Sequence, residues 1–153
     1  MAANESRRYP KRPVLGVGAL IFEDDRVLLV ERGREPLKGQ WSLPGGAVET
    51  GERLEDALVR EVREETGLEV APTQVAVIFE RIIHDAEGQP EYHYLLVDFL
   101  CGLRGGALCA GDDSSCAQWF PLNDLDRLSM TEGTLAVIRR VHAVGPSLAI
   151  LSP

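Results

Sequence analysis

The chain has 153 residues, of which 44% are hydrophobic and 26% charged, and its formal net charge is −8 at pH 7. This length and composition are typical of one globular domain with its own core. The acidic balance disfavours nonspecific nucleic-acid binding, which depends on Lys and Arg neutralising phosphates. Residues 1–13 lack the apolar run of a signal peptide, and no stretch is long enough to span a membrane.

The cysteines give a second indication of the cellular compartment. Cys101, Cys109 and Cys116 are odd in number and show no CxxC spacing. This pattern predicts reduced thiols rather than a disulfide or a zinc site. We therefore expect a cytoplasmic protein.

The first half of the chain predicts a hairpin followed by a helix. Residues 1–12 are polar and are expected to form a flexible arm before a single domain over residues 13–153. Val14–Phe22 and Val27–Glu31 are apolar and flank the turn sequence EDDR, which favours a β-hairpin. Gly45 and Gly46 are expected to form a turn, and helical periodicity then runs to Thr66, with Gly67 suited to the helix C-terminus.

The second half is richer in strands. Val75–Ile83, Tyr92–Cys101 and Ala117–Pro121 are predicted strands because they are β-branched, aromatic and apolar. A helical turn is expected at 122–125, and Thr131 fits the N-cap of a last helix that ends before Gly145. Because strands outnumber helices, the pattern predicts a mixed α/β fold packed in layers.

The predicted first helix carries an unusual concentration of acid. Glu61, Glu64 and Glu65 share one face at i, i+3 and i+4 spacing. Such carboxylates repel one another unless positive charge lies among them, and hard cations such as Mg²⁺ prefer carboxylate and phosphate oxygens. A solvated face with ion pairs is the alternative. The preceding Gly-Gly pair favours the metal site, because glycine lets the backbone approach a ligand closely.

The segment GAVETGERLEDALVREVREETGL, residues 46–68, resembles the complete Nudix box. Its fixed positions are Gly46, Glu52 and the run from Arg60 to Leu68. The strings RPVLGVGALIF, GQWSLPGG, YHYLLVDFL and QWFPL extend the likeness over most of residues 10–142. These strings look most similar to the ADP-ribose pyrophosphatase-like branch of the superfamily.

The resemblance implies an α/β fold, a Nudix-like α/β/α sandwich with a mixed β-sheet and the box as a loop–helix–loop. It also implies hydrolysis of a nucleoside diphosphate linked to another moiety, with Mg²⁺ or Mn²⁺ as cofactor. The expected partner is a small-molecule nucleotide rather than a nucleic acid or a membrane. Many relatives are dimers, so a homodimer is expected.

The same resemblance assigns roles to residues of the box. Glu61, Glu64 and Glu65 are implied metal ligands together with the Gly46 carbonyl oxygen, and one glutamate acts as the base. The catalytic set is Glu61, Glu64 and Arg60, with Arg60 orienting a glutamate through a bidentate pair. Glu52 is expected to have a structural role at the start of the helix.

Substrate contacts are expected outside the helix. Arg32, Arg34 and Lys38 lie where they could reach phosphate, and solvated loop charge is the alternative. Some family members draw an acidic ligand from the loop before the late Trp-containing strand, where this chain has Asp112 and Asp113; turn chemistry is the alternative. Trp41 and Phe79 suit base stacking or the core. The predicted substrate-binding set is Arg32, Lys38, Gly45 and Asp113.

The substrate itself is not determined by the box. An ADP-ribose-like nucleotide is favoured by the flanking strings, and a sanitising nucleoside triphosphate pyrophosphohydrolase is the first alternative. A non-catalytic nucleotide-sensing domain is the second. The intact carboxylates argue against the sensor, as does a chain too short for an added DNA-binding domain.

Overall fold

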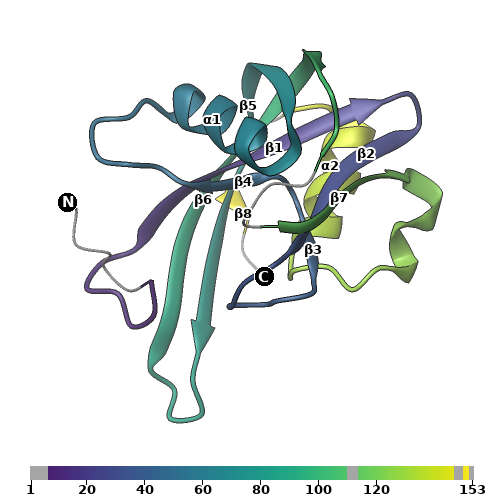
Figure 1. The fold of residues 1–153 in the computed structure, drawn as a ribbon. Coiled ribbons are helices and arrows are strands. Elements are labelled where there is room, and N and C mark those ends of the chain that lie inside the picture. Colours follow the sequence, from purple (N-terminus) through teal and green to yellow (C-terminus); the bar gives the residue numbers. More distant parts are fainter. Residues whose placement is uncertain (1–6, 110–113, 147–149, 152–153) are drawn as a thin grey trace.

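The computed structural model describes residues 7–109, 114–146 and 150–151, and Figure 1 shows their arrangement. In chain order the elements are β1 (Val14–Glu23), β2 (Arg26–Arg32), β3 (Trp41–Ser42), β4 (Gly45–Ala47), α1 (Leu54–Thr66), β5 (Leu68–His84), β6 (Pro90–Gly106), β7 (Ser114–Pro121), the 3₁₀ helix η1 (Leu122–Arg127), α2 (Thr134–Val144) and β8 (Ile150–Leu151). The mixed α/β class predicted from the sequence is confirmed.

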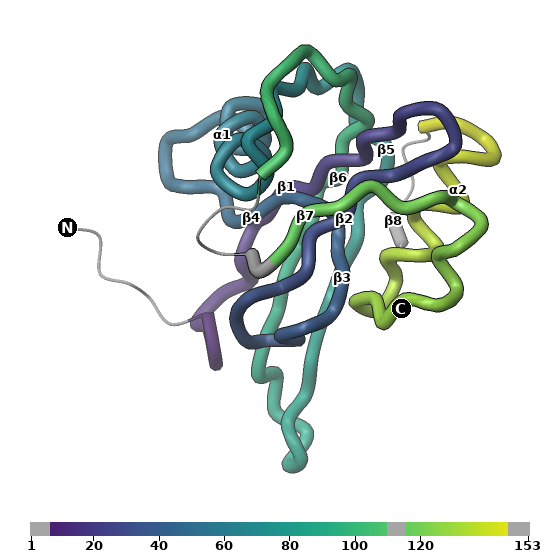
Figure 2. Tube along the Cα trace, turned by 45° about the vertical axis from the view of Figure 1, so that its right-hand side comes forward, coloured from purple at the N-terminus to yellow at the C-terminus, as the bar shows by residue number. Residues whose placement is uncertain are grey.

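The strands form one mixed sheet. Its order is β3-β2-β1-β6-β5-β8, with β4 paired to β1 and β7 paired to β2. β1 and β2 pair antiparallel across the predicted hairpin, whereas β1 and β6 run parallel. β5 and β6 form a long hairpin whose tip projects beyond the rest of the molecule in Figures 1 and 2.

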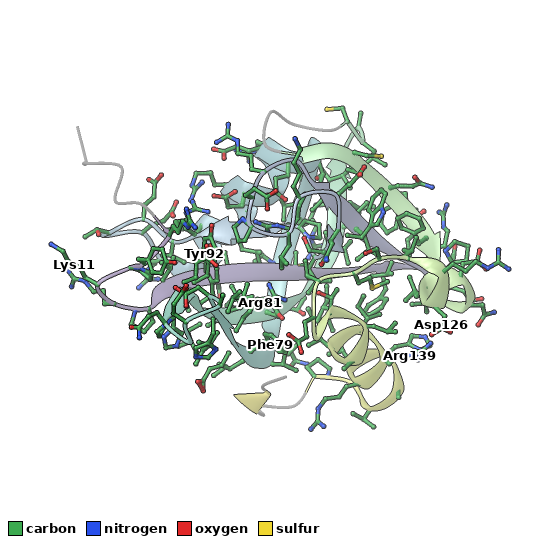
Figure 3. All side chains as sticks on the ribbon, turned by 90° about the horizontal axis from the view of Figure 1, so that it is seen from below. Lys11, Phe79, Arg81, Tyr92, Asp126 and Arg139 are labelled. Carbon is green, nitrogen blue, oxygen red and sulfur yellow. The ribbon has the colours of Figure 1, made fainter. Side chains whose placement is uncertain are left out.

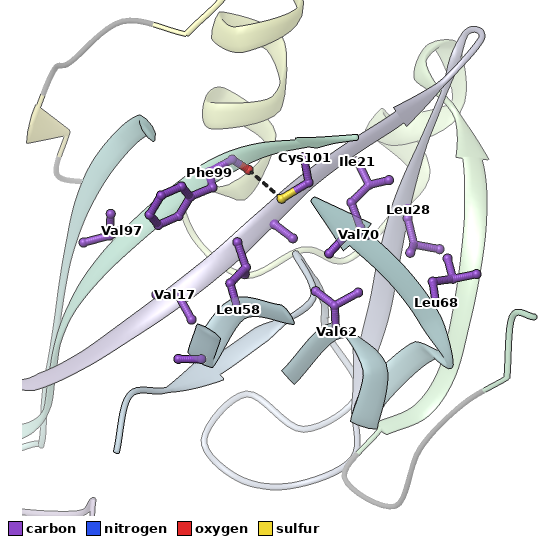
Figure 4. Packing of buried hydrophobic residues seen from close by; sticks show 12 residues of the cluster. Val17, Ile21, Leu28, Leu58, Val62, Leu68, Val70, Val97, Phe99 and Cys101 are labelled. Atoms are coloured by element: carbon purple, nitrogen blue, oxygen red, sulfur yellow. Dashed lines mark hydrogen bonds between the residues drawn. The ribbon is translucent and has the colours of Figure 1, made fainter. Parts of the chain in front are cut away.

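Alternate residues of β1 face different helices, as the two-residue period of a strand requires. Val17, Ala19 and Ile21 belong to the core cluster that contains Leu58 and Val62 of α1 (Figure 4). Leu20 belongs to the opposite cluster, which contains the α2 residues Val137, Ile138 and Val141. The sheet is therefore covered by α1 on one face and α2 on the other, as expected for the sandwich.

The cysteines of the structure are free thiols. Cys101 is buried in the α1-side cluster and its thiol points to the Phe99 carbonyl oxygen at 3.7 Å (Figure 4). Burial raises the pKa of Cys101 to about 12, which keeps this thiol protonated. Cys109 and Cys116 are also unpaired, in agreement with the expected reduced state.

Helix α1 ends as its sequence predicts. Gly67 adopts a left-handed conformation, with φ 77°, and its N–H donates to the Arg63 carbonyl oxygen at 2.9 Å. Acidic residues in the first turn and a basic residue in the last complement the helix dipole.

No helix in the described part of the chain is long and apolar enough to cross a membrane.

Two local expectations were wrong. Gly45 and Gly46 do not form a turn but belong to β4, because this segment pairs antiparallel with Gly18 and Val17 of β1. Thr131 is not the N-cap of α2. That position is Gly133, whose φ of 87° suits glycine, and the Thr131 hydroxyl instead lies 2.6 Å from the Thr134 hydroxyl.

Of the expected N-terminal arm, residues 1–6 lie outside the described residues. Within the described part, the Tyr9 N–H donates to the Glu91 carbonyl oxygen at 2.7 Å, and the Tyr9 hydroxyl donates to Asp85 at 2.7 Å. The chain just before β1 therefore contacts the projecting β5–β6 hairpin.

Replacing Gly67 by alanine should destabilise the fold more than replacing Gly51. Both glycines have positive φ, so each alanine costs about 1 kcal/mol in backbone strain. A Cβ on Gly67 would also collide with the Ala107 carbonyl oxygen and approach the Cys109 sulfur at 2.8 Å, whereas nothing lies within 4 Å at Gly51. Urea unfolding of Gly67→Ala and Gly51→Ala measures the difference, and equal losses would contradict it.

Candidate active site

The carboxylates of α1 differ in exposure because the buried stripe of the helix fixes its rotation. Val62 and Thr66 are fully buried, and the Thr66 hydroxyl donates to the Val62 carbonyl oxygen at 2.6 Å. The Glu61 side chain is then 15% exposed, whereas that of Glu64 is 56% exposed. The three acids predicted to act together are therefore divided between a buried wall and the solvent.

Glu61 and Glu65 lie against the two glycines of β4. A Cβ on Gly46 would stand 2.6 Å from Glu61 Oε2 and 2.7 Å from Oε1, so only glycine leaves room for this carboxylate. The Gly45 N–H donates to Glu65 Oε2 at 3.2 Å. The Gly-Gly pair thus brings the backbone of β4 into contact with the helix acids.

Arg60 links the loop before α1 to the carboxylates of the helix. It donates from Nε and Nη2 to the two carboxylate oxygens of Glu52, at 2.7 and 2.8 Å, which is a bidentate pair. Its Nη1 donates to Glu61 Oε1 at 2.8 Å and reaches Glu64 at 3.4 Å. A further contact to the Ala47 carbonyl oxygen, at 3.3 Å, ties in the end of β4.

These contacts move the pKa values of the acids in opposite directions. The hydrogen bond from Arg60 lowers the pKa of Glu52 to about 2. Burial raises the pKa of Glu61, and the hydrogen bond and charge of Arg60 oppose that rise. Glu52 is therefore a fixed anion that anchors Arg60.

A cavity of about 380 Å³ opens beside this cluster, and its size is that of a small-molecule site. The residues predicted from the sequence that line it include Glu61, Glu65, Gly45, Gly46, Arg32 and Arg34.

Other predicted residues lie elsewhere. Arg60, Glu64 and the exposed Lys38 are outside the lining. Asp112 and Asp113 lie outside the described residues. Arg32 itself donates from Nε to the Pro36 carbonyl oxygen at 2.7 Å, which holds its stem against the β2–β3 loop.

The donor set at the wall of the cavity fits a hard divalent cation. Two carboxylates, Glu61 and Glu65, lie there against the backbone of Gly46 and Gly45, and both supply oxygen. Magnesium commonly takes one or two carboxylates and completes its shell with water and phosphate. Within the described ranges, no group of three or more Asp, Glu, Cys or His side chains is placed so that it could hold a metal ion by itself.

The lining of the cavity also contains charged residues that the sequence analysis missed. Asp98 and Arg81 both line it, and Asp98 is only 4% exposed. Burial raises the pKa of Asp98 to about 7. One signal was available, since Asp98 is the single charged residue in the apolar run Leu95–Cys101. Phe79, 4% exposed, also lines the cavity but packs in the α2-side cluster.

Comparison with known proteins places this geometry in a family. The NUDIX domain family matches residues 12–141, most of the chain. This protein is a Nudix hydrolase. It is 38% identical, over 117 residues, to the ADP-ribose pyrophosphatase of Methanocaldococcus jannaschii, a match that covers 76% of this chain and 67% of that protein.

Two solved structures extend the similarity of this Nudix hydrolase. A MutT NUDIX hydrolase from Burkholderia pseudomallei is 32% identical, with a TM-score of 0.73 over 86% of this chain and 99% of that one. The NUDIX domain of Shewanella oneidensis NrtR, solved in complex with ADP ribose, is 26% identical, with a TM-score of 0.70 over 86% and 88%.

Asp98→Asn should make the free energy of unfolding of the Nudix hydrolase less sensitive to a rise in pH. The folded state holds the Asp98 proton up to about pH 7, whereas the unfolded chain releases it near the ordinary pKa of about 4. Stability contributed by the neutral acid is therefore present at low pH and lost as pH rises through 7. From pH 5 to pH 8 the wild type should lose roughly 2–3 kcal/mol relative to the variant.

Urea unfolding of both proteins at pH 5 and pH 8 measures this loss. Asp126→Asn is the matched control, because Asp126 is exposed and outside the cavity lining. Identical pH dependence in wild type and Asp98→Asn would show that Asp98 ionises normally.

Proposed function

We propose that this Nudix hydrolase cleaves the diphosphate of a nucleoside diphosphate linked to another moiety, with an ADP-ribose-like molecule as substrate and Mg²⁺ or Mn²⁺ as cofactor. The observation that carries the proposal is the contact of the Glu61 and Glu65 carboxylates with Gly46 and Gly45 at the wall of a ligand-sized cavity. The likeness to the archaeal ADP-ribose pyrophosphatase supports the choice of substrate.

At this wall the cation would be held by the carboxylates of Glu61 and Glu65 and by the Gly46 carbonyl oxygen. The more exposed Glu64 would lie beside them. When bound, a divalent cation neutralises diphosphate oxygens and makes a bound water more acidic. Arg60 holds the Glu61 carboxylate by a hydrogen bond of 2.8 Å and favours its charged form against burial. A glutamate kept charged in this way is able to accept a proton from the attacking water.

Substrate phosphates also require positive charge from the chain. Arg32 lines the cavity, and because its Nε is bound to the Pro36 carbonyl oxygen, the two Nη groups carry the remaining donors. We assign phosphate binding to Arg32 and the Gly45 backbone. Lys38 is exposed beyond the lining, and we give it no contact.

Two other functions are favoured by particular comparisons. The likeness to a MutT NUDIX hydrolase supports a sanitising nucleoside triphosphate pyrophosphohydrolase. The likeness to an NrtR domain bound to ADP ribose supports a domain that binds the nucleotide without cleaving it. The three functions differ in what the protein releases from a panel of nucleotides.

The direct experiment is hydrolysis of ADP-ribose, NADH, diadenosine polyphosphates and 8-oxo-dGTP, each with Mg²⁺, with Mn²⁺ and with EDTA. We expect ADP-ribose to be cleaved fastest, to AMP and ribose 5-phosphate, and the chelator to abolish turnover. Preferred release of diphosphate from 8-oxo-dGTP would support the sanitising function instead. Binding of ADP-ribose without products, with either metal, would support the sensor.

Glu61→Gln and Glu65→Gln should each lower turnover on the order of 10²-fold or more, because the amide keeps the shape but removes the charge. Glu55→Gln on the first, exposed turn of α1 is the matched control and should retain full turnover. Circular dichroism establishes that each variant is folded. Near-normal turnover of both site variants with metal present would falsify the assignment.

Gly46→Ala should lower activity while leaving the fold in place. The added Cβ would overlap the Glu61 carboxylate and force it away from the β4 backbone. A displacement of about 1 Å in an active site can cost 10²-fold in rate. Gly51→Ala, in open space on the loop between β4 and α1, is the control for turnover, and equal rates in the two variants would contradict the proposed position of Glu61.

A further inference from the structure

One carboxylate in the cavity lining has no hydrogen-bond partner among the described residues. Asp98 lies in β6 between Leu96 and Leu100, and these two neighbours pack in the α2-side core cluster. Although only 4% exposed, its carboxylate accepts no hydrogen bond from the described residues, and it lines the cavity. A buried polar group is normally hydrogen-bonded, and a buried charge without a partner costs free energy. The position therefore requires an explanation beyond folding.

The fold makes room for this side chain. Gly18 of β1 pairs directly with Asp98, and a Cβ at Gly18 would collide with Asp98 Oδ1. A larger residue in β1 would fill the place that the carboxylate occupies. The local sequence thus accommodates an acid in the sheet without giving it a donor.

Arg81 supplies a second unsatisfied group in the same lining. Its Nη2 donates to the Glu132 carbonyl oxygen at 2.8 Å and reaches the Thr131 hydroxyl at 3.4 Å. Its Nε is buried and finds no hydrogen-bond partner within the described part of the chain. The guanidinium also lies over the Phe79 ring, 5.3 Å from the centroid, and both residues are near the centre of Figure 3.

Arg81 does not neutralise Asp98 by direct contact. Among the described residues no ion pair within 4.0 Å joins them, and the charge of Arg81 lowers the pKa of Asp98 only from a distance, against the larger effect of burial. Asp98 therefore offers an unsatisfied hydrogen-bond acceptor, and Arg81, at a separate position in the lining, offers an unsatisfied donor. A ligand that satisfies both must present a donor and an acceptor on one edge.

This pattern corresponds to the edge of an amino-bearing nucleobase. Adenine presents the N6 amine as donor beside a ring nitrogen as acceptor. Apolar side chains also line this part of the cavity, including Leu43, Leu96 and Val137. A ribose diol would likewise satisfy the carboxylate, but its polar faces suit these apolar side chains less well than the flat faces of a base.

The distance between Asp98 and the proposed reaction centre also suits the length of one nucleotide. Gly18 pairs with Asp98 on one side and with Gly45 on the other, so the three residues lie across adjacent strands. Neighbouring strands are roughly 4.8 Å apart, which separates the Asp98 and Gly45 backbones by about 10 Å. One nucleotide with its phosphates at Gly45 is therefore able to reach Asp98 with its base.

We propose that Asp98 and Arg81 form the base-recognition subsite of this enzyme. In it, Asp98 accepts a hydrogen bond from the exocyclic N6 amine of adenine, and a rotation of the Arg81 guanidinium brings its Nε–H, which is buried in this structure, to the ring nitrogen N7. This inference rests on the proposed function for the placement of the phosphates. It makes Asp98 the residue that selects an amino-bearing base over one with a carbonyl at the same position.

The test compares binding of AMP and IMP, measured by calorimetry with the full chain, without metal and at pH 8.5, where the Asp98 carboxyl is ionised. IMP replaces the amine by a carbonyl oxygen, which would face the Asp98 carboxylate. The wild type should prefer AMP by roughly 10- to 100-fold, the discrimination of one well-placed base contact. In Asp98→Asn the side-chain amide is able to accept from the amine or donate to the carbonyl, so the preference should fall to nearly onefold.

Two further variants make the result specific. Arg81→Lys keeps the positive charge but removes the Nε–H, and should weaken AMP binding several-fold. Asp126→Asn, the matched control, lies at the edge of the molecule in Figure 3, where it pairs with Arg139, and should bind as the wild type does. A gain in affinity for IMP in Asp98→Asn cannot result from unfolding, because misfolding lowers the affinity for both nucleotides.

The outcomes separate this inference from the proposed function. An unchanged AMP-to-IMP ratio in Asp98→Asn, tighter binding of GMP than of AMP by the wild type, or no wild-type binding of AMP would each overturn the subsite. If ADP-ribose is hydrolysed but the ratio does not change, only the subsite is wrong. If the ratio changes as expected but ADP-ribose is not hydrolysed, the subsite stands and the proposed reaction is wrong.

Discussion

One guanidinium holds the acidic half of this enzyme together. Arg60 binds Glu52, Glu61 and the Ala47 carbonyl oxygen at once, and so joins the loop before α1, the helix itself and β4. Without a cation among them, these acids would repel one another and separate. Because the bidentate bond goes to Glu52, which lies outside the cavity lining, the protein fixes Arg60 with one carboxylate and uses it to position another.

The fold was predictable where a residue acts through its own backbone conformation or through the apolar pattern of its own segment. The apolar run of β1 beside the turn sequence EDDR indicated a strand, and Gly67 indicated the end of α1, since both signals are local. β4 was missed because its three residues become a strand only through pairing with β1, far away in sequence. Thr131 was assigned as a cap because its hydroxyl suits that role; in the structure the hydroxyl is taken by Thr134, and Gly133 supplies the required φ.

The site residues were predictable to the same extent, since only those with a local signal in the sequence were found. The box places Glu61 and Glu65 together because both lie one helical turn apart on a helix whose buried face is evident from the sequence. That Glu64 turns toward solvent follows from the rotation set by Val62 and Thr66 in the core. Asp98 and Arg81 lie on strands whose residues otherwise read as core, and only the cavity beside them distinguishes a binding group from a packing defect.

The parallel pairing of β1 with β6 has a consequence for how the molecule is made. Val14 pairs with Tyr94 and Ile21 with Cys101, so the central strand of the sheet has its neighbour far downstream. During synthesis on the ribosome, β1 and β2 emerge early and form a hairpin that no third strand covers on the β1 side. The sheet closes only after β6 has left the exit tunnel, and until then a chaperone that shields apolar strands has an unpaired edge to bind.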